Sequence, residues 1–190
     1  MNYSVILENV SKSFGDKKVL QNCSVTFEAG ITTAVLGASG SGKTTLMRIA
    51  AGLLLPDSGT VVRDKELSLS FVFQDDRLLP WYTALENVMF AGISREIAVD
   101  VLDSLGLGAE LSSLPSELSG GMCRRVAIAR ALAYNGDVYF LDEPLRGLDK
   151  STAQQVLAVL KNTIKGKTVL LVTHNAEESS LLAQSTVTLG

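Results

Sequence analysis

The chain has 190 residues, a length that predicts one domain with room for a small inserted subdomain. Its 17 basic residues face 20 acidic ones, for a net charge of −3, which argues against a broad nucleic-acid-binding surface. Hydrophobic residues make up 46% of the sequence, so we expect a large core or an apolar surface that meets a partner. No apolar run approaches the roughly 18 residues that a membrane span needs.

The N-terminal residues and the two cysteines bear on targeting and redox state. The first residues lack the basic and apolar regions of a signal peptide. Cys23 and Cys123 are too widely spaced for a disulfide framework or a metal knuckle, so reduced cytosolic thiols are expected.

The first 75 residues are predicted to form strands around one glycine-rich turn. Apolar residues alternate from Val19 to Phe27, which is typical of a half-buried strand. A β-branched run at 31–37 ends in glycine, and the residues at 43–54 have a helical pattern. Strand, tight turn and helix therefore follow in direct succession. Two further strands are predicted at 59–63 and 67–73.

After residue 75 the pattern changes to helices and loops. Thr83 and Glu86 form a capping box that starts a short helix through Phe90, and residues 95–105 are a second helical candidate. The apolar run GDVYFLDEP predicts a strand that Pro144 prevents from continuing. Helix, strand, helix and strand are then expected at 151–165, 167–174, 175–184 and 185–190. This alternation predicts a mainly parallel sheet covered on both faces, with a helical insert between roughly 75 and 135.

The segment GASGSGKT fits the phosphate-loop pattern G-x-x-x-x-G-K-[ST]. Its glycines allow the backbone to wrap a phosphate with N–H groups, and the following helix N-terminus adds partial positive charge. Lys43 is predicted to reach the β- and γ-phosphates, and the Thr44 hydroxyl to ligate Mg²⁺. The predicted nucleotide contacts come from Gly37, Ala38, Ser39, Gly40, Ser41, Gly42, Lys43, Thr44 and Thr45.

Two carboxylates and a histidine follow predicted strands. Asp142 ends a buried strand at the edge where α/β sheets bind ligands, so we expect it to hold Mg²⁺ through water. Glu143 would then activate the attacking water as general base, although an acidic turn at a strand end is the structural alternative. His174, the only histidine, follows another strand at the same edge. There it would contact the γ-phosphate, whereas a lone histidine is otherwise most often structural.

Three other features allow a functional and a structural interpretation. Gln74 lies where a strand leaves the sheet, so it either contacts Mg²⁺ and the attacking water or is a turn residue. Phe14 either offers a face for adenine stacking or belongs to the core. The apolar residues at 78–82 either dock a partner or form a hydrophobic staple, in which Tyr82 or Trp81 packs on the following helix.

A second glycine-rich helix start lies at residues 117–121, ELSGG, and it has no lysine. In chain order, Phe14, GASGSGKT, Gln74, LSGGM, VYFLDEP, LRGLD and His174 resemble the motifs of an ATP-binding cassette (ABC) ATPase over almost the whole chain. The pair of phosphate loop and LSGG is highly specific to that family among P-loop proteins. No guanine-reading N-K-x-D motif follows, which argues against a GTPase.

The resemblance implies an α/β P-loop NTPase fold with a mainly parallel sheet, an antiparallel β portion near the N-terminus and an inserted α-helical subdomain. It implies a single ABC ATPase domain at 1–190, with a catalytic core at about 1–74 and 136–190 and a helical subdomain at about 75–135. ATP and Mg²⁺ are the implied ligands. Members of this family work as head-to-tail pairs, with ATP between the phosphate loop of one subunit and the LSGG segment of the other.

That arrangement implies contacts to the partner's ATP from Ser119, Gly120, Gly121 and Met122, while Asp149 crosses the same interface. Some positions depart from the family pattern. Met122 stands where Gln is usual, Phe14 replaces the more usual Tyr, and RGLD stands where SALD is typical. The region between Gly59 and Gln74 and the helical insert look trimmed. Because the phosphate-loop, strand-end and histidine residues remain, the resemblance implies an active ATPase.

The run VFQDDRLLPW is similar to the ATPase subunits of bacterial importers for nitrate, alkanesulfonate, taurine and thiamine-precursor-like solutes. This implies a second ABC subunit, in a homodimer or heterodimer, a membrane permease near residues 78–82, and an extracytoplasmic solute-binding protein. The implied place is cytoplasmic, peripheral on the inner face of the cell membrane. A soluble assembly ATPase and a weakly hydrolysing regulatory subunit stay open as alternatives. No long heptad pattern supports a repair or chromosome-type cassette.

Overall fold

The computed structural model describes residues 4–63 and 66–190, and the chain divides into two compact units. The first unit comprises Met1–Leu69, Asp137–Asp142 and Ile164–Gly190, and the second comprises Ser70–Gly136 and Glu143–Thr163. The second unit thus includes residues that the sequence analysis groups with the core, and the predicted domain bounds stay a prediction. Two short ranges, 1–3 and 64–65, lie outside the described residues. The first belongs to the chain start, where no signal peptide is predicted, and the second to the segment between Gly59 and Gln74 that is predicted to be trimmed.

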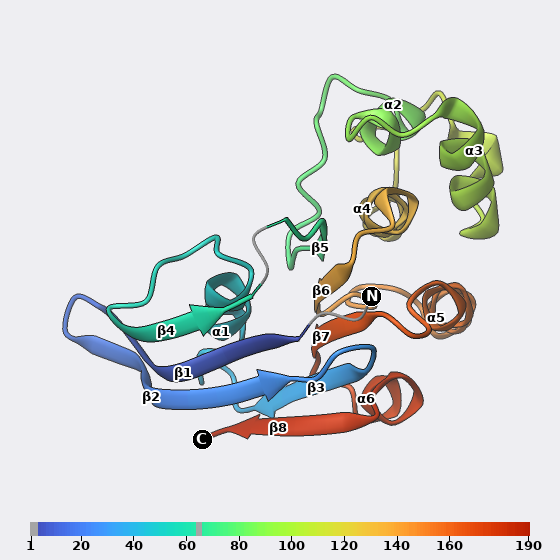
Figure 1. The fold of residues 1–190 in the computed structure, drawn as a ribbon. Coiled ribbons are helices and arrows are strands. Elements are labelled where there is room, and N and C mark those ends of the chain that lie inside the picture. The colour runs from blue at the N-terminus through green and yellow to red at the C-terminus, as the bar shows by residue number, and fades with distance from the viewer. Residues whose placement is uncertain (1–3, 64–65) are drawn as a thin grey trace. The chain divides into compact units, whose positions relative to one another are not determined.

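An antiparallel sheet opens the first unit (Figure 1). Strand β1 (Val5–Phe14) pairs with β2 (Lys17–Phe27) on one side and β4 (Ser58–Val62) on the other. Gly15, at a φ of 58°, turns the chain between β1 and β2 in the left-handed region that glycine adopts readily. The half-buried strand predicted around residues 19–27 is confirmed as β2.

The first unit also contains parallel strands, which lie in the order β6-β7-β3-β8. Their bounds are β3 (Thr32–Gly37), β6 (Val138–Asp142), β7 (Thr168–Val172) and β8 (Ser185–Leu189). Every residue of β6 and β7 is buried, which explains why these strands, apart from Asp142 and Thr168, are continuously apolar rather than alternating. Parallel pairing brings the carboxyl ends of β3, β6 and β7 to one edge, where ligands bind in open α/β sheets.

Two helices of the first unit begin at that edge. Helix α1 (Lys43–Ala50) follows β3 after the glycine-rich loop, and α6 (Ala176–Leu182) follows β7. The predicted succession of strand, tight turn and helix is therefore confirmed. Strand β5 (Leu69–Val72) leads from the first unit into the second.

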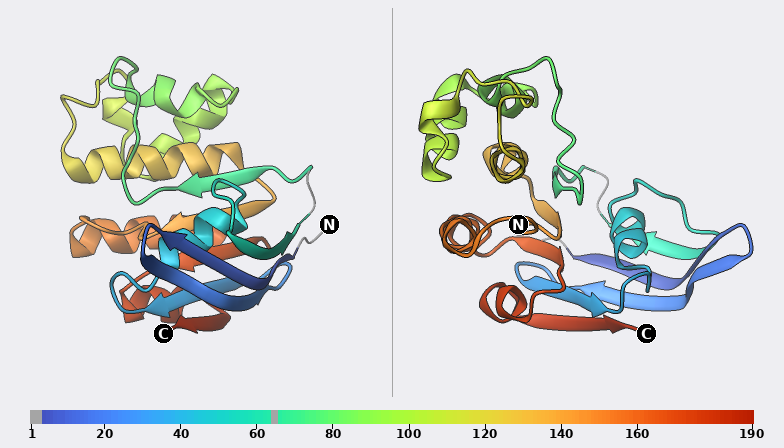
Figure 2. Two further views of the ribbon diagram at one scale, coloured as in Figure 1. Left: turned by 90° about the vertical axis from the view of Figure 1, so that its left-hand side faces the viewer. Right: turned by 180° about the vertical axis from the view of Figure 1, so that it is seen from behind.

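The second unit is helical. Helices α2 (Ala84–Met89), α3 (Arg95–Ser104) and α4 (Gly120–Tyr134) pack on one another (Figure 2). A short 3-10 turn, η1 (Gly108–Glu110), lies between α3 and α4, and α5 (Lys150–Thr163) follows later in the chain. Most of α4 is buried, so it forms the centre of this bundle.

The capping box predicted at the start of α2 is confirmed. The Glu86 backbone N–H donates to the Thr83 hydroxyl at 3.2 Å, and the Thr83 N–H donates to the Glu86 carboxylate at 2.8 Å. Together the elements confirm the predicted fold class, a mainly parallel sheet with an N-terminal antiparallel part and inserted helices. Among the residues with described positions, no helix is long and apolar enough to cross a membrane.

Candidate functional site

The loop between β3 and α1, called here the phosphate loop (residues 37–45), has a backbone that only glycine fits at several points. Gly37, Gly40 and Gly42 have φ angles of 149°, 80° and 95°. A Cβ atom on Gly37 would lie 2.5 Å from a backbone oxygen of Leu189, and one on Gly42 would lie 3.0 Å from the Val19 carbonyl oxygen. The glycines of the motif are therefore required by the path of the chain.

Lys43 spans this loop. Its Nζ donates to the carbonyl oxygens of Gly37 at 2.9 Å and Ala38 at 2.8 Å. The N-cap of α1 is Gly42, so no side chain caps the helix, and its first turn contains no acidic residue. Ser41 Oγ is buried and has no hydrogen-bond partner among the described residues. An uncapped helix start, a lysine and an orphaned hydroxyl around one loop fit a bound phosphate group.

Thr44 and Asp142 meet at the carboxyl edge of the parallel strands. The Thr44 hydroxyl donates to Asp142 Oδ2 at 2.9 Å, and Asp142 is buried at the end of β6. Hydroxyl and carboxylate oxygens suit Mg²⁺, which normally completes its shell with water and substrate phosphates. No cluster of three or more metal-binding side chains forms in the part of the chain that is described. The pair therefore fits a magnesium ion held together with a phosphate, rather than an all-protein metal cage.

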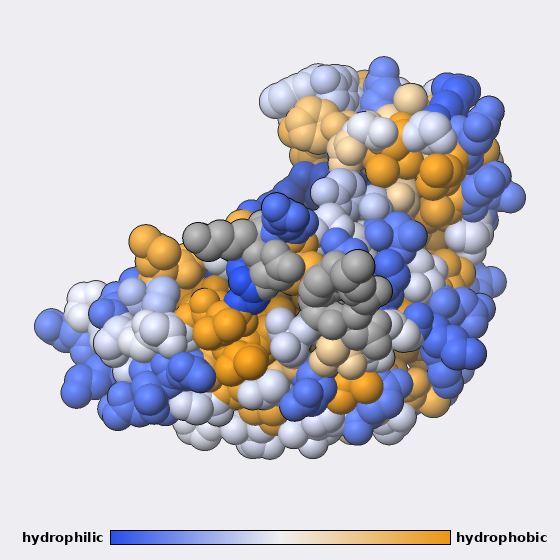
Figure 3. Space-filling model, in the orientation of Figure 1, coloured by the Kyte–Doolittle hydropathy of each residue, from blue (hydrophilic) through white to orange (hydrophobic). Residues whose placement is uncertain are grey.

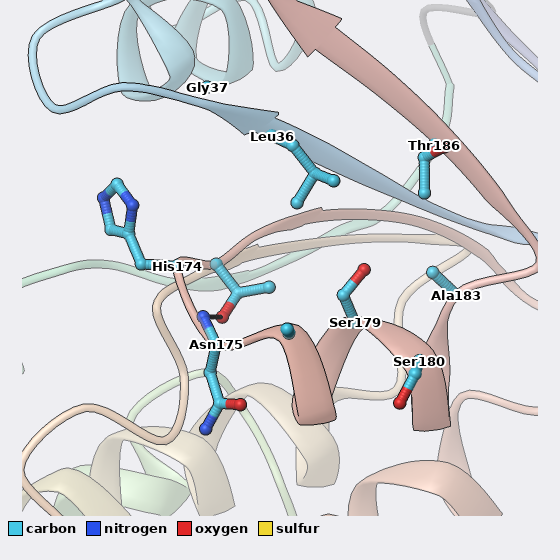
Figure 4. A pocket seen from close by; sticks show the side chains of 10 residues that line it. Leu36, Gly37, His174, Asn175, Ser179, Ser180, Ala183 and Thr186 are labelled. Carbon is cyan, nitrogen blue, oxygen red and sulfur yellow. Dashed lines mark hydrogen bonds between the residues drawn. The ribbon is translucent and has the colours of Figure 1, made fainter.

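His174 follows β7 at the same edge. It lines a cavity of about 530 Å³ with Gly37 and Leu36 of β3 on one side and residues of α6 on the other (Figure 4). Its loop is fixed by its neighbours. The Thr173 hydroxyl donates to Glu178 at 2.5 Å and accepts the Asn175 N–H at 3.0 Å. The imidazole is exposed, as a residue that meets a ligand must be.

The remaining predicted hydrolysis residues belong to the second unit. Gln74 is exposed just after β5. Glu143 has a φ of 48°, a costly left-handed conformation for a residue with a Cβ, and its Oε2 lies 3.9 Å from Arg146 Nε. Such strain is concentrated at functional positions in proteins. The first unit thus gathers Lys43, Thr44, Asp142 and His174, and the second contains Gln74 and Glu143.

The LSGG segment (residues 118–121) also starts a helix, but this start is capped. Ser119 is the N-cap of α4, and its hydroxyl accepts the Met122 N–H at 3.2 Å. A Cβ atom on Gly120 would meet no atom within 4 Å, whereas one on Gly121 would lie 3.5 Å from Leu148. Ser119 and Gly120 are exposed, and Met122 is partly exposed. The segment therefore presents an accessible helix N-terminus without a cation.

Exposure decides between the two interpretations of Phe14, and hydrogen bonds define the local role of Asp149. The Phe14 ring is 52% exposed, so its interpretation as a core residue is wrong. Asp149 caps α5, because its carboxylate accepts the Thr152 hydroxyl at 2.6 Å and N–H at 3.0 Å, and the Ser151 hydroxyl at 2.7 Å. These donors, Thr152 foremost, hold the pKa of the Asp149 carboxyl well below its usual range. The trans contact expected of Asp149 stays a prediction.

The apolar residues at 78–82 contain both a staple and an exposed side chain. The rings of Tyr82 and Phe90 lie 5.9 Å apart, so Tyr82 packs on the end of α2, whereas Trp81 is 69% exposed. Hydrophobic side chains reach the surface over the helices of the second unit, at the upper right of Figure 3. The large exposed apolar side chains of this unit are Trp81, Phe90, Ile97 and Tyr134.

Asn87 organises this segment, and the sequence analysis missed it. Its side chain is fully buried and accepts the Leu79 N–H at 2.8 Å. It donates to the carbonyl oxygens of Leu79 at 3.1 Å, Tyr82 at 2.8 Å and Thr83 at 3.0 Å. The available signal was a single amide between apolar residues on the buried face of α2.

The sequence matches the family described as ABC transporter over residues 20–146. The aliphatic sulfonates import ATP-binding protein SsuB 1 of Burkholderia cenocepacia (strain HI2424) is 42% identical over 188 residues. That match covers 94% of this chain but only 59% of the SsuB protein. The arginine transport ATP-binding protein ArtM of Bacillus subtilis (strain 168) is 39% identical, and the match covers 88% of this chain and 80% of ArtM.

Solved structures agree with these sequence matches. A dimeric structure of a post-hydrolysis state of the ATP-binding cassette MJ0796, bound to ADP and Pi, superimposes with a TM-score of 0.88 at 32% identity. The superposition covers 97% of this chain and 94% of that one. The expected resemblance to ABC ATPases of sulfonate importers is confirmed by these matches. The chain therefore belongs to the ABC transporter family, as one of its ATP-binding cassettes.

Proposed function

We propose that this chain is the ATP-hydrolysing subunit of a bacterial ABC importer. The observation that carries the proposal is the phosphate loop, which combines Lys43, an uncapped helix start and the orphaned Ser41 hydroxyl with the Thr44–Asp142 pair. The proposal is supported by a relative named as an import ATP-binding protein, by another named as a transport ATP-binding protein, and by a neighbour bound to ADP and Pi.

The phosphate loop binds the nucleotide. Lys43 Nζ exchanges the carbonyl oxygens of Gly37 and Ala38 for phosphate oxygens, and the N–H groups of the loop and α1 complete the contact. Phe14, exposed at the end of β1, stacks on adenine. Thr44 and Asp142 would hold Mg²⁺. When bound, that ion would supply positive charge that offsets the charge of the phosphate groups.

Glu143, the residue after Asp142, accepts the proton of the attacking water as the water oxygen bonds to the γ-phosphorus and the bond to ADP breaks. Gln74 contacts that water, and His174 donates to a γ-phosphate oxygen. Both are exposed at the ends of strands, β5 for Gln74 and β7 for His174. The carboxylate of Glu143 is the single group in this set that serves as a base.

Two cassettes complete the site in this proposal. Ser119, Gly120, Gly121 and Met122 of one copy contact the γ-phosphate held by the phosphate loop of a second copy, and Asp149 joins the interface. The accessible N-terminus of α4 and the dimeric form of the structural neighbour support this pairing. No second lysine is needed, because Lys43 neutralises the phosphate from the opposite side.

The Glu143→Gln variant tests the hydrolysis proposal. Loss of the base should lower turnover by about 10²- to 10⁴-fold while ATP binding is retained. Size-exclusion chromatography in excess ATP should show an accumulated ATP-bound dimer. The control is Glu28→Gln, an exposed carboxylate after β2, which should match the wild-type protein in both measurements. Full turnover by Glu143→Gln, or monomers that persist in excess ATP, would contradict the proposal.

The import function rests on the apolar residues at 78–82. Asn87 fixes their backbone while Trp81 stays 69% exposed, which suits a surface that docks a membrane permease at the inner face of the cell membrane. A solute-binding protein would deliver the solute, whose identity those other chains determine. The same exposure disfavours a soluble assembly ATPase, the alternative function.

The docking interpretation is tested in membranes that contain the cognate permease. The double variant Leu79→Ser, Trp81→Ser should keep the ATPase rate of the isolated cassette but lose stimulation by the permease. The matched control is Leu53→Ser, Leu55→Ser, which removes two exposed leucines of the first unit. Normal stimulation of the ATPase rate of the double variant by the permease would show that this surface does not dock the permease.

A further inference from the structure

Arg124 is a buried charge within the second unit. It belongs to α4, and only 4% of its side chain is exposed. A guanidinium is costly to bury unless its N–H groups are paired, so its position indicates a specific set of partners. Those partners come from two segments that the proposed mechanism uses.

On one side, Arg124 holds the segment that follows β5. Its Nη1 donates to the carbonyl oxygen of Phe73 at 2.6 Å, lies 3.4 Å from that of Gln74, and pairs with Asp76 Oδ1 at 3.1 Å. Arg130, also on α4, adds to this attachment by donating to the Asp76 carbonyl oxygen at 3.0 Å. The backbone that carries Gln74 is thus fastened to α4.

On the other side, Arg124 holds the backbone of Glu143. Its Nη2 donates to the Glu143 carbonyl oxygen at 2.6 Å, and its Nε donates to that of Pro144 at 2.9 Å. The Arg146 N–H donates to the same Glu143 oxygen at 3.1 Å. These donors hold Glu143 at its φ of 48°, a left-handed conformation that is unfavourable for a residue with a Cβ.

We propose that Arg124 is a positioning residue for ATP hydrolysis. One planar guanidinium sets the backbones of Gln74 and Glu143 relative to each other, and it does so from the helix whose N-cap is Ser119. A γ-phosphate bound at the N-terminus of α4 would then influence the positions of Gln74 and Glu143 through the Arg124 guanidinium. The inference rests on the proposed ATPase function, because it needs Gln74 and Glu143 to act on the same water.

Geometry separates this role from that of an ordinary buried ion pair. A lysine would keep the positive charge beside Asp76, but a single ammonium lacks the fixed fork that spans Phe73 and Glu143. If only the positive charge mattered, Arg124→Lys would retain turnover. If the geometry of the guanidinium matters, Arg124→Lys loses turnover, and removal of the Asp76 charge alone has little effect on it.

The test compares steady-state kinetics of variants that remain folded by circular dichroism and thermal melting. Arg124→Lys should lower kcat about 100-fold, as expected for misplaced catalytic groups, with KM for ATP changed less than about twofold. Arg124→Gln, which buries no charge and so folds more readily, should likewise lower kcat while leaving KM for ATP nearly unchanged. Asp76→Asn retains the carbonyl contacts of Arg124 and should keep kcat within about twofold of wild type.

Arg125→Lys is the matched control, since Arg125 neighbours Arg124 on α4 but donates to Leu105 and Gly106 at the end of α3. It should lower the melting temperature without a selective loss of kcat. A kcat within twofold of wild type in Arg124→Lys or Arg124→Gln would overturn the inference while the ATPase proposal stands. A wild-type protein without ATPase activity would overturn both.

Discussion

The two glycine-rich helix starts of this chain differ in how their N–H groups are satisfied. At the phosphate loop the N-cap is Gly42, no side chain caps α1, and Lys43 lies across two carbonyl oxygens. At the LSGG segment the N-cap is Ser119, whose hydroxyl already accepts an N–H from its own helix. The first start therefore has no side-chain cap, whereas at the second one N–H group is already satisfied by the Ser119 hydroxyl.

In the proposed function, this difference explains how one small chain would use two anion-binding helix starts. The phosphate loop combines a cation, an orphaned hydroxyl and free helix N–H groups, so it is suited to bind a phosphate alone. The LSGG segment has an accessible helix N-terminus but no cation, so it is suited to add to a phosphate that is already neutralised. We therefore propose that the first start determines the affinity for ATP and that the second detects a bound phosphate.

The largest expected effect follows loss of the lysine. Lys43→Ala should weaken ATP binding at least about 100-fold, because it removes the charge-assisted hydrogen bonds that Nζ would make with phosphate. Calorimetric titration with ATP measures this affinity, with Lys18→Ala, a change at an exposed residue of β2, as the control. Unchanged ATP affinity in Lys43→Ala would contradict the proposed difference between the phosphate loop and the LSGG segment.

A smaller effect is expected at the second start. Ser119→Ala removes the cap of α4, which should cost about 1 kcal/mol of stability, and it removes a donor to the partner's phosphate. ATP affinity of the isolated cassette should stay within about twofold, while turnover of the paired form falls about tenfold. Weakened ATP binding by the monomer, measured in the same titration, would show that Ser119 acts within its own chain.

The smallest effect is expected at Met122. Its backbone N–H already bonds to Ser119, and its thioether cannot donate a hydrogen bond as a glutamine amide does. Met122→Gln should therefore change the ATPase rate by less than about threefold, since Ser119 and the glycine backbone supply donors. A large gain in steady-state turnover would instead indicate that this LSGG segment is weakened by its methionine.

Local patterns account for the features that could be predicted. The phosphate loop, the capping box at Thr83 and the strand-end position of Asp142 each depend on a few consecutive residues, and the structure contains all three. The Thr44–Asp142 bond joins residues far apart in the chain, yet it follows from the rule that parallel strands share their carboxyl edge.

The contacts of arginine and asparagine with backbone carbonyls could not be predicted in this way. In the structure, Arg124 and Arg130 donate to carbonyl oxygens of the segment after β5, and Arg125 donates to carbonyl oxygens at the end of α3. Such partners depend on tertiary packing, which leaves no periodic signal along the chain. The same holds for Asn87 beneath the apolar residues at 78–82.

The central claim is that each ATP lies between Lys43 of one copy and the LSGG segment of another. Gly120→Asp places a negative charge at that segment, where a Cβ meets no atom within 4 Å and a carboxylate suits a helix N-terminus, so the variant should fold.

The most direct test mixes Lys43→Ala with Gly120→Asp, each inactive alone. In a head-to-tail pair, a mixed dimer has one site with both defects and one site with neither. An equal mixture should therefore regain about a quarter of the wild-type ATPase rate, because about half of the pairs are mixed and each has one intact site. A mixture no more active than the two variants measured separately would contradict the shared site.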